Sequence, residues 1–245
     1  MSTVIDPMDN TTETGFTPEQ VPPRRVVVLL SGEGQRLEAL IEAQSHDELK
    51  GELVAVITDR IDAQGATKAR AAGIDVAVLP RSEYDTPTAY DGALIKTIER
   101  HAPDLVVLDD FRHLFGSLFT SRFNGRLLNC HPSLLPMLKG SHTHRRALDQ
   151  GVKEHGASVH FIIEGLNTGP LVLQAAANVA HSDTVETLAI KVRAREALIY
   201  PIAIRWFLEG RLTLGARGAE LDGTPLPPAG LRLSHDDAEE EISGE

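Results

Sequence analysis

Short, uninterrupted apolar segments that alternate with helical segments constrain the fold of this chain most. The first, residues 25–31 (RVVVLLS), is rich in β-branched residues and leucine, which is typical of a strand buried on both faces. Further strands are expected at 53–58, 76–79, 105–108 and 126–131, with helices after residue 34 and at 63–72 and 89–100. Strands that alternate with helices predict a parallel sheet with crossover helices. We therefore expect an α/β fold, a doubly wound, mostly parallel sheet of Rossmann-like type in a single domain.

The second half of the chain departs from strict alternation. Residues 158–163 alternate polar and apolar side chains, which predicts an antiparallel strand at an edge, and residues 172–179 continue the β pattern. A long helix is expected at 185–208, with a break at Tyr200 and Pro201. Residues 221–228 (LDGTPLPP) predict a short hairpin around Asp222 and Gly223.

Charge is distributed unevenly along the 245 residues. The net charge is -11, of which residues 1–24 carry -3 and residues 233–245 carry -6, so that 25–232 carry only -2. We expect a disordered acidic leader at 1–24, one domain at 25–232 and a disordered acidic tail at 233–245. A nearly neutral body without a basic face argues against a nucleic-acid partner.

Cysteine usage and hydropathy exclude other classes. A single cysteine excludes an intramolecular disulfide framework and a Cys-rich zinc site. The longest apolar runs are far shorter than a membrane span, and the first residues lack the basic and apolar regions of a signal peptide. We expect a cytoplasmic protein that does not bind a membrane. The sequence leaves the oligomeric state open.

The turn between the first strand and its helix reads S-G-E-G-Q-R-L, residues 31–37. Glycines before a helix N-terminus allow backbone N–H groups to face an anion. Three interpretations stay open at this point: a phosphate-type anion site, a purely structural turn, and a dinucleotide site. Leu37 at the third glycine position disfavours the dinucleotide. Arg36 favours an anion, whereas Glu33 opposes one.

A second candidate segment, R-L-L-N-C-H-P-S-L-L-P, covers residues 126–136. In a strand, Asn129 and His131 share one face and Cys130 points to the other, which rules out a Cys–His nucleophile pair. One interpretation is structural, with Asn129 capping the strand and His131 satisfied in the core. The other places both at the carboxyl end of a parallel strand, where His can transfer a proton and Asn can donate to an oxyanion.

The histidines and a Gly–Pro stretch are two further candidate features. Five histidines follow one another closely, but no nearby Cys or acid completes a ligand set, so we expect no metal; they are His131, His142, His144, His155 and His160. The Gly–Pro stretch at 166–170 is either an ordinary loop or a lid over Asn129 and His131.

Together these segments resemble the folate-dependent formyltransferases, and among them the glycinamide ribonucleotide formyltransferase family of purine synthesis. The resemblance runs from about residue 25 to about residue 228. It is carried, in order, by R-L-L-N-x-H-P-S-L-L-P, by G-x-H-T-H-R-x-A-L at 140–148, by H-G-x-S-V-H-F at 155–161, and by the Gly–Pro loop.

The resemblance implies roles for particular residues. Asn129 and His131 correspond to catalytic residues, and Gly34, Gln35 and Arg36 correspond to the site of the substrate phosphate. Glu196 corresponds to an acid that contacts the nucleotide substrate. Walls of the folate pocket are implied for the following residues: Phe111, Arg112, His113, Leu114, Phe115, Ile163 and Thr168.

Three departures from the family pattern fall at the implied site. Asn167 (N-T-G-P) stands where the family has a catalytic Asp in a D-G-G-P-like loop. Glu33, Gln35 and Arg36 replace the polar residues of S-G-N-G-S-N. The stretch 110–113, Asp-Phe-Arg-His, replaces Gly-Phe-Met-Arg at the folate pocket.

The resemblance implies formyl transfer from 10-formyltetrahydrofolate to the amine of glycinamide ribonucleotide, without a metal, and with Asn167 slowing the reaction. Two alternatives stay open: a formyltransferase that acts on another small amine, and a catalytically impaired relative that binds folate or nucleotide. Methionyl-tRNA formyl transfer is rejected because the chain has neither a second domain nor a basic surface for tRNA.

Overall fold

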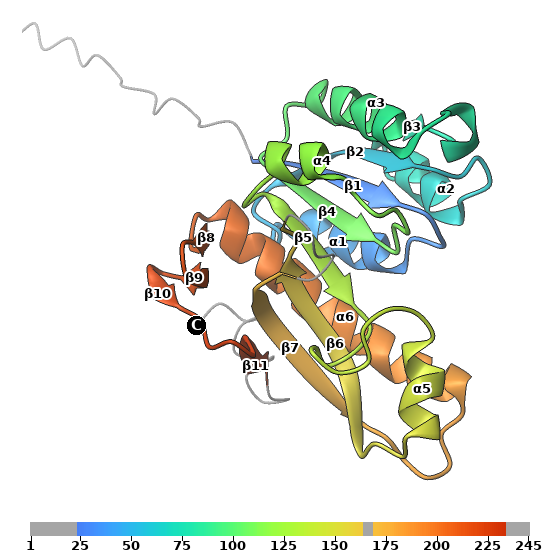
Figure 1. Ribbon diagram of the computed structural model, residues 1–245, viewed down its shortest axis with the longest axis vertical. Helices are drawn as coiled ribbons and strands as arrows, with labels where there is room; N and C mark the ends of the chain where they lie inside the picture. Colours follow the sequence, from blue (N-terminus) through green and yellow to red (C-terminus); the bar gives the residue numbers. More distant parts are fainter. Residues whose placement is uncertain (1–23, 164–168, 234–245) are drawn as a thin grey trace, which may run out of the picture.

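The computed structural model describes residues 24–163 and 169–233, and its centre is an eight-stranded sheet with the order β11-β7-β6-β5-β4-β1-β2-β3 (Figure 1). The strands of this sheet are β1 (Arg25–Leu30), β2 (Glu52–Thr58), β3 (Asp75–Val78), β4 (Leu105–Asp109), β5 (Leu127–His131), β6 (Glu154–Phe161), β7 (Leu171–Asn178) and β11 (Leu231–Leu233). β6 runs antiparallel to β5 and β7, and every other neighbouring pair is parallel.

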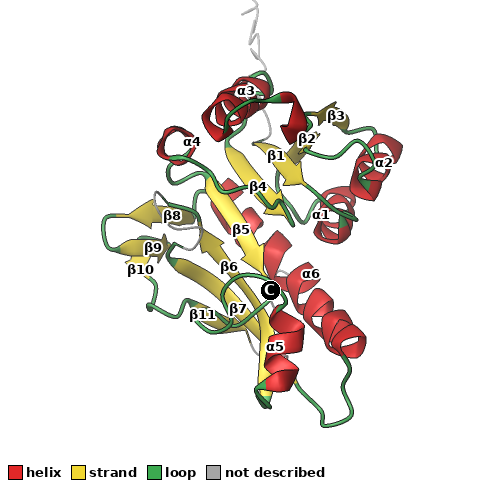
Figure 2. Ribbon diagram, turned by 45° about the vertical axis from the view of Figure 1, so that its right-hand side comes forward, coloured by secondary structure: helices red, strands yellow, loops and turns green. Residues whose placement is uncertain are grey.

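Helices cover both faces of the sheet (Figure 2). They are α1 (Gln35–Ser45), α2 (Gln64–Ala71), α3 (Pro87–Glu99), α4 (Ser117–Arg122), α5 (Thr143–Asp149) and α6 (Val185–Leu208), with a 3-10 turn at Arg81–Glu83. Successive residues of β1 alternate between two buried clusters, since Val26 and Val28 pack with α1 and α6 whereas Val27 and Leu29 pack with α3 and α4. The doubly wound, mostly parallel α/β fold is thereby confirmed.

The chain reverses its direction of travel through the sheet between β1 and β4. β2 and β3 extend the sheet to one side of β1, and β5 extends it to the other side of β4. The helix after β1 and the helix after β4, α1 and α4, therefore lie on opposite faces of the sheet. The segments that lead to them border a crevice at the carboxyl edge, which is where open α/β sheets bind ligands.

A buried tyrosine of α6 fastens that helix to the strands beside the crevice. The Tyr200 hydroxyl accepts from the Leu108 N–H at 2.9 Å and lies 3.0 Å from the Leu108 carbonyl and 3.1 Å from the Leu128 carbonyl. Because one hydroxyl thus contacts both β4 and β5, α6 keeps a fixed position against the two strands that end at the crevice.

Three expectations about the second half need correction. β6 is antiparallel but internal, because β7 and β11 continue the sheet beyond it. α6 runs unbroken through Pro201; the carbonyl that this proline leaves without an N–H partner belongs to the exposed Ala197, where water can satisfy it. β11 includes Leu233, one residue into the expected tail, where Leu233 pairs with Ala175.

The expected hairpin around Asp222 and Gly223 belongs to a separate three-stranded antiparallel sheet. It consists of β8 (Leu212–Gly215), β9 (Gly218–Leu221) and β10 (Thr224–Pro225). The sequence interpretation missed β8, whose pairing with β9 supports the hairpin. Within the described ranges, no helix is long and apolar enough to cross a membrane.

Candidate active site

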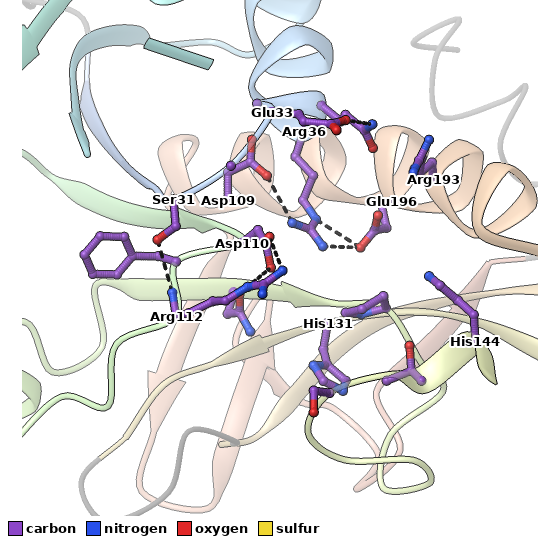
Figure 3. Close-up of a pocket in the computed structure, with 18 of the residues that line it drawn as sticks. Ser31, Glu33, Arg36, Asp109, Asp110, Arg112, His131, His144, Arg193 and Glu196 are labelled. Carbon is purple, nitrogen blue, oxygen red and sulfur yellow. Dashed lines mark hydrogen bonds and ion pairs between the residues drawn. The ribbon is translucent and has the colours of Figure 1, made fainter. Parts of the chain in front are cut away.

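A cleft of about 900 Å³ opens at the carboxyl edge of the sheet (Figure 3). Its walls come from the loops after β1 and β4, from the end of β5, from the segment that leads into α5, and from one face of α6. The loops after β1 and β4 are joined by a hydrogen bond of 3.3 Å from the Arg112 N–H to the Ser31 hydroxyl. The crevice predicted by the topology is thus lined with polar side chains.

The turn after β1 has the geometry of an anion site in its backbone. Gly34 has φ 71°, and a Cβ added to it would lie 2.6 Å from the Gly65 Cα, so both the conformation and the contact with α2 require glycine. The N–H groups of Gln35 and Arg36 at the start of α1 donate to no other residue of the described chain. The side chain of Gln35 is engaged separately, donating to Glu33 at 2.7 Å.

The side chain of Arg36 does not point freely into the cleft. Its guanidinium is buried between two acids: Nη1 donates to Asp109 Oδ1 at 3.0 Å, and Nε donates to Glu196 Oε1 at 3.0 Å, with Nη2 donating to the same Glu196 oxygen (Figure 3). Burial alone would lower the pKa of Arg36, but Glu196 and Asp109 hold it well above the ordinary value. Burial also raises the pKa of Glu196, and the pairing with Arg36 opposes that rise.

Asn129 and His131 lie on the same side of β5 and both reach the cleft, whereas Cys130 is buried on the other side. Asn129 Nδ2 lies 3.1 Å from Nε2 of the buried His160. Burial lowers the pKa of His160 to about 4, so this ring is neutral near pH 7. Since Nδ1 of His160 lies 2.9 Å from the Phe161 carbonyl and donates to it, Nε2 accepts from Asn129 and fixes the orientation of the amide.

His131 is half-buried, and its Nε2 lies 3.4 Å from the Leu138 carbonyl. Burial is the largest cause that lowers the pKa of His131, and the positive charges of Arg36 and Arg146 lower it further. The imidazole is therefore neutral near pH 7, with a nitrogen able to accept a proton.

The stretch that the resemblance assigns to the folate pocket divides into two groups. Phe111 and Arg112 line the cleft. His113 is instead buried, with Nε2 2.6 Å from Asp91 Oδ1, and Phe115 stacks on Phe119 with ring centroids 4.1 Å apart, so both belong to the packing beneath α3 and α4.

The other implied folate contacts lie outside the cleft wall or outside the described residues. Leu114 is 73% exposed, and Ile163 is half-buried. Thr168 falls outside the described residues, as does the implied catalytic position Asn167.

Comparison with known proteins decides the family. The family model described as Formyl transferase matches residues 24–204. The chain is 45% identical over 205 residues to the phosphoribosylglycinamide formyltransferase of Escherichia coli, covering 84% of this chain and 97% of that protein. The solved phosphoribosylglycinamide formyltransferase of Coxiella burnetii superposes with a TM-score of 0.83 at 42% identity, covering 86% of this chain and 100% of that chain.

The chain belongs to the formyl transferase family. The similarity to phosphoribosylglycinamide formyltransferases confirms the family inferred from the motifs, the enzyme class of folate-dependent formyltransferase and the use of 10-formyltetrahydrofolate as co-substrate. A formyltetrahydrofolate deformylase of Pseudomonas putida shares the fold more distantly, with a TM-score of 0.74 at 28% identity over 82% of this chain and 70% of that chain.

The sequence motifs of this formyltransferase gave no indication of three cleft residues that bear on its function, namely Arg60, Asp109 and Arg193. Arg193 precedes Glu196 by one helical turn and lines the same wall, and no ion pair links it to another described residue. The spacing R-x-x-E on a predicted helix could have revealed it. Asp109 is the last residue of β4 and directly follows the strand predicted at 105–108, and an acid that ends an apolar strand is itself a signal.

The histidines do not assemble a metal site in the part of the chain that the structure describes, where no group of three or more His, Cys, Asp or Glu side chains is placed to hold an ion. His144 Nδ1 instead lies 3.2 Å from His155 Nε2, and burial lowers the pKa of His155 to about 4. This pair borders the formyltransferase cleft through His144.

Proposed function

We propose that this formyltransferase moves the formyl group of 10-formyltetrahydrofolate to the primary amine of glycinamide ribonucleotide, at the cleft that contains Asn129 and His131. The observation that carries the proposal is the order of groups along this one cleft. In Figure 3, Arg193 and Glu196 lie on one side of the cleft, Arg112 lies on the other, and His131 lies below and between them. The open backbone amides of Gln35 and Arg36, the side chain of Asn129 and the ring of Phe111 line the same cleft.

The first end suits a phosphorylated ribose. The N-terminus of α1 offers two N–H donors and the positive end of its dipole, and the guanidinium of Arg193 can donate to phosphate oxygens. Glu33 places a like charge nearby, which weakens the attraction. Arg193, rather than the side chain of Arg36, is our choice for the cationic partner of the phosphate.

Asn129 and His131 suit the chemistry of acyl transfer. The amine attacks the formyl carbon, and negative charge develops on the formyl oxygen. The second N–H of Asn129 Nδ2, not used by His160, donates to that oxygen. The neutral imidazole of His131 accepts the amine proton and returns it to the departing folate nitrogen as the carbon–nitrogen bond to folate breaks.

The far end of the cleft fits the co-substrate. The ring of Phe111 supplies an apolar wall for a flat heterocycle, and the exposed guanidinium groups of Arg60 and Arg112 lie beside it, where carboxylates could be bound. When bound there, 10-formyltetrahydrofolate supplies the formyl carbon. Residues 163 and 168 are retained as proposed contacts from the loop after β6.

Asn167 is the proposed weak point of the catalytic set. It occupies the position of the family's catalytic Asp, and an amide oxygen accepts a hydrogen bond but carries no charge and takes up no proton. We propose that the transfer is slow for this reason.

The decisive experiment mixes purified protein, 10-formyltetrahydrofolate and glycinamide ribonucleotide, and follows loss of the formyl group from folate together with formylation of the nucleotide. Transfer in stoichiometric amounts, lost in Asn129→Ala, supports the proposal. Release of formate without the nucleotide would indicate hydrolysis instead, and formylation of only a different amine would identify another substrate. Tight binding of both ligands without turnover would indicate a binding protein.

Small molecules are the partners of this chain on this proposal. The nearly neutral charge of residues 25–232 supports the further proposal that neither nucleic acid nor a membrane surface is a partner. The single cysteine supports the proposal that the protein acts in the reducing cytoplasm.

A further inference from the structure

Three charged side chains from distant parts of the chain form a buried row at the nucleotide end of the cleft. Asp109 ends β4, Arg36 opens α1 and Glu196 lies on α6, and their side chains are 3%, 10% and 7% exposed (Figure 3). Asp109 is itself fixed, because its Oδ2 accepts from the Leu37 N–H at 3.0 Å. The row carries one positive and two negative charges.

The two carboxylate oxygens of Glu196 differ in their hydrogen-bond partners. Both Nε and Nη2 of Arg36 donate to Oε1, and no described residue donates to Oε2. Since Glu196 lines the cleft, Oε2 is the oxygen left to accept from a ligand. A carboxylate oxygen in that state matches hydroxyl donors such as those of a ribose.

Arg36 and Asp109 depend on one another. Without Arg36, Asp109 and Glu196 would be two buried acids without a counter-charge between them, and at least one would become protonated. Without Asp109, the Nη1 of Arg36 loses its acceptor and the guanidinium can turn away from Oε1. Removing both takes away one charge of each sign, which disturbs Glu196 less than removing Arg36 alone.

We propose that Arg36 is a positioning residue for the nucleotide substrate and not a ligand of its phosphate, and that Asp109 and Arg36 act as a coupled pair that presents Glu196 Oε2 to the ribose hydroxyls. The proposal rests on the proposed function, since it takes the nucleotide as the ligand at this end. It assigns the phosphate to Arg193 and the backbone of α1.

A double-mutant cycle of Arg36→Asn and Asp109→Ala in the full-length protein tests the coupling. Asparagine and alanine are neutral, so the net charge of the row, -1 in the parent, becomes -2 in Arg36→Asn and 0 in Asp109→Ala, and returns to -1 in the double variant. Affinity for glycinamide ribonucleotide, measured by calorimetry, should fall about tenfold or more in Arg36→Asn and recover to within about threefold of the parent in the double variant. The KM for folate should stay unchanged in all three variants. Single effects that simply add would overturn the coupling.

Inorganic phosphate, used as a competitor of the nucleotide, separates positioning from direct phosphate binding. Its inhibition constant should be the same in the parent and in the double variant, and should rise about tenfold in the matched control Arg193→Gln. A rise in the double variant as large as in Arg193→Gln would show that Arg36 binds phosphate.

Calorimetry keeps the two proposals apart. A parent that binds the nucleotide without formylating it would contradict the proposed function while the cycle still reports on the row. A parent that binds neither the nucleotide nor phosphate would overturn both.

Discussion

The two ends of the cleft contain the same kinds of charged group in opposite surroundings. At the α6 end, Arg36, Asp109 and Glu196 are almost fully buried. At the far end, the Arg112–Asp110 pair has side chains 80% and 47% exposed, and Arg60–Asp62 is equally open to solvent. All of these pairs have contacts near 3.0 Å, so distance does not distinguish them.

Burial determines what each pair can do. An exposed pair contributes roughly 0–1 kcal/mol and can exchange its partner for water or a ligand at little cost. A buried pair is held in one geometry, and loss of one member leaves a charge in a poorly solvated place. The α6 end is therefore suited to fixed recognition of a compact substrate, and the far end to adaptable contacts with a longer ligand.

The largest effect is expected from restoring a carboxylate at residue 167, and it tests whether an acid at the exposed end of the cleft already supplies the catalytic charge. Asn167→Asp should raise kcat strongly, by up to about ten-thousandfold if the effect parallels that of the orienting Asp in Ser-His-Asp enzymes, with little change in either KM. Steady-state kinetics measures both parameters.

Asp110 is the alternative source of the missing charge, and Asp110→Gly is its test. If Asp110 serves only as the exposed partner of Arg112, Asp110→Gly leaves kcat unchanged. Abolished activity in Asp110→Gly, together with no gain in Asn167→Asp, would assign the catalytic charge to the exposed end.

The next largest effect on kcat is expected from substitutions of the two cleft residues of β5. Asn129→Ala and His131→Ala should each lower kcat about a hundredfold to a thousandfold, because each removes a group that faces the reacting atoms. Melting temperatures within a few degrees of the parent would separate a catalytic from a structural role. Parental turnover in both variants would remove the active site from this strand.

Stability provides the most direct contrast between the ends. Arg36→Met should lower the free energy of unfolding by about 3–5 kcal/mol, since it leaves Asp109 and Glu196 buried without a counter-charge. The matched Arg112→Met should change it by about 0.5 kcal/mol or less. Urea unfolding of the two variants measures the difference, and equal losses would refute the contrast.

A smaller effect is expected in the pH profile. His131 must be neutral to accept a proton. Because its pKa is lowered from the ordinary histidine value of about 6.5, kcat/KM should decrease only when the pH falls below that value. Because the charge of Arg36 helps to lower this pKa, Arg36→Met should move the acid limb to higher pH. A limb that stays in place would mean that the buried row does not act on His131.

The smallest effect is expected from trimming the chain to residues 24–233. The removed segments contain few apolar side chains, so we expect unchanged activity and a melting temperature within a few degrees of the parent. Differential scanning calorimetry would detect a larger loss, which would show that a terminal segment packs on the body.

Strand periodicity explains which parts of the site could be predicted. Asn129 and His131 are two residues apart in a strand, so their common direction follows from the backbone alone. The side chain of Arg36 is different, because its partners lie 73 and 160 positions away and its direction is set only when α1, β4 and α6 meet. For the same reason nothing in the local sequence indicates that His113 turns inward to Asp91.

The fold was predictable to a similar extent. Strands that are apolar on both faces predicted the parallel sheet. In the structure, alternate residues of β1, β4 and β5 are buried in the two clusters on opposite faces of the sheet. β8 (LTLG) ends in a glycine and lacks the β-branched apolar run that revealed the equally short β3 (DVAV). The passage of α6 through Pro201 depends on which side of the helix meets solvent.

The hydroxyl of Tyr200 links three of the elements that line the cleft, namely β4, β5 and α6. It joins the backbone of β4, whose next residue is Asp109, to that of β5, whose next residue is Asn129, and it does so from the helix that carries Glu196. One hydroxyl group therefore contacts the backbone beside Asp109 and beside Asn129, and it belongs to the helix that carries Glu196. A displacement of α6 would carry Tyr200 and Glu196 together, so any movement of the proposed ribose acceptor would strain the hydrogen bonds that the same helix makes to β4 and β5.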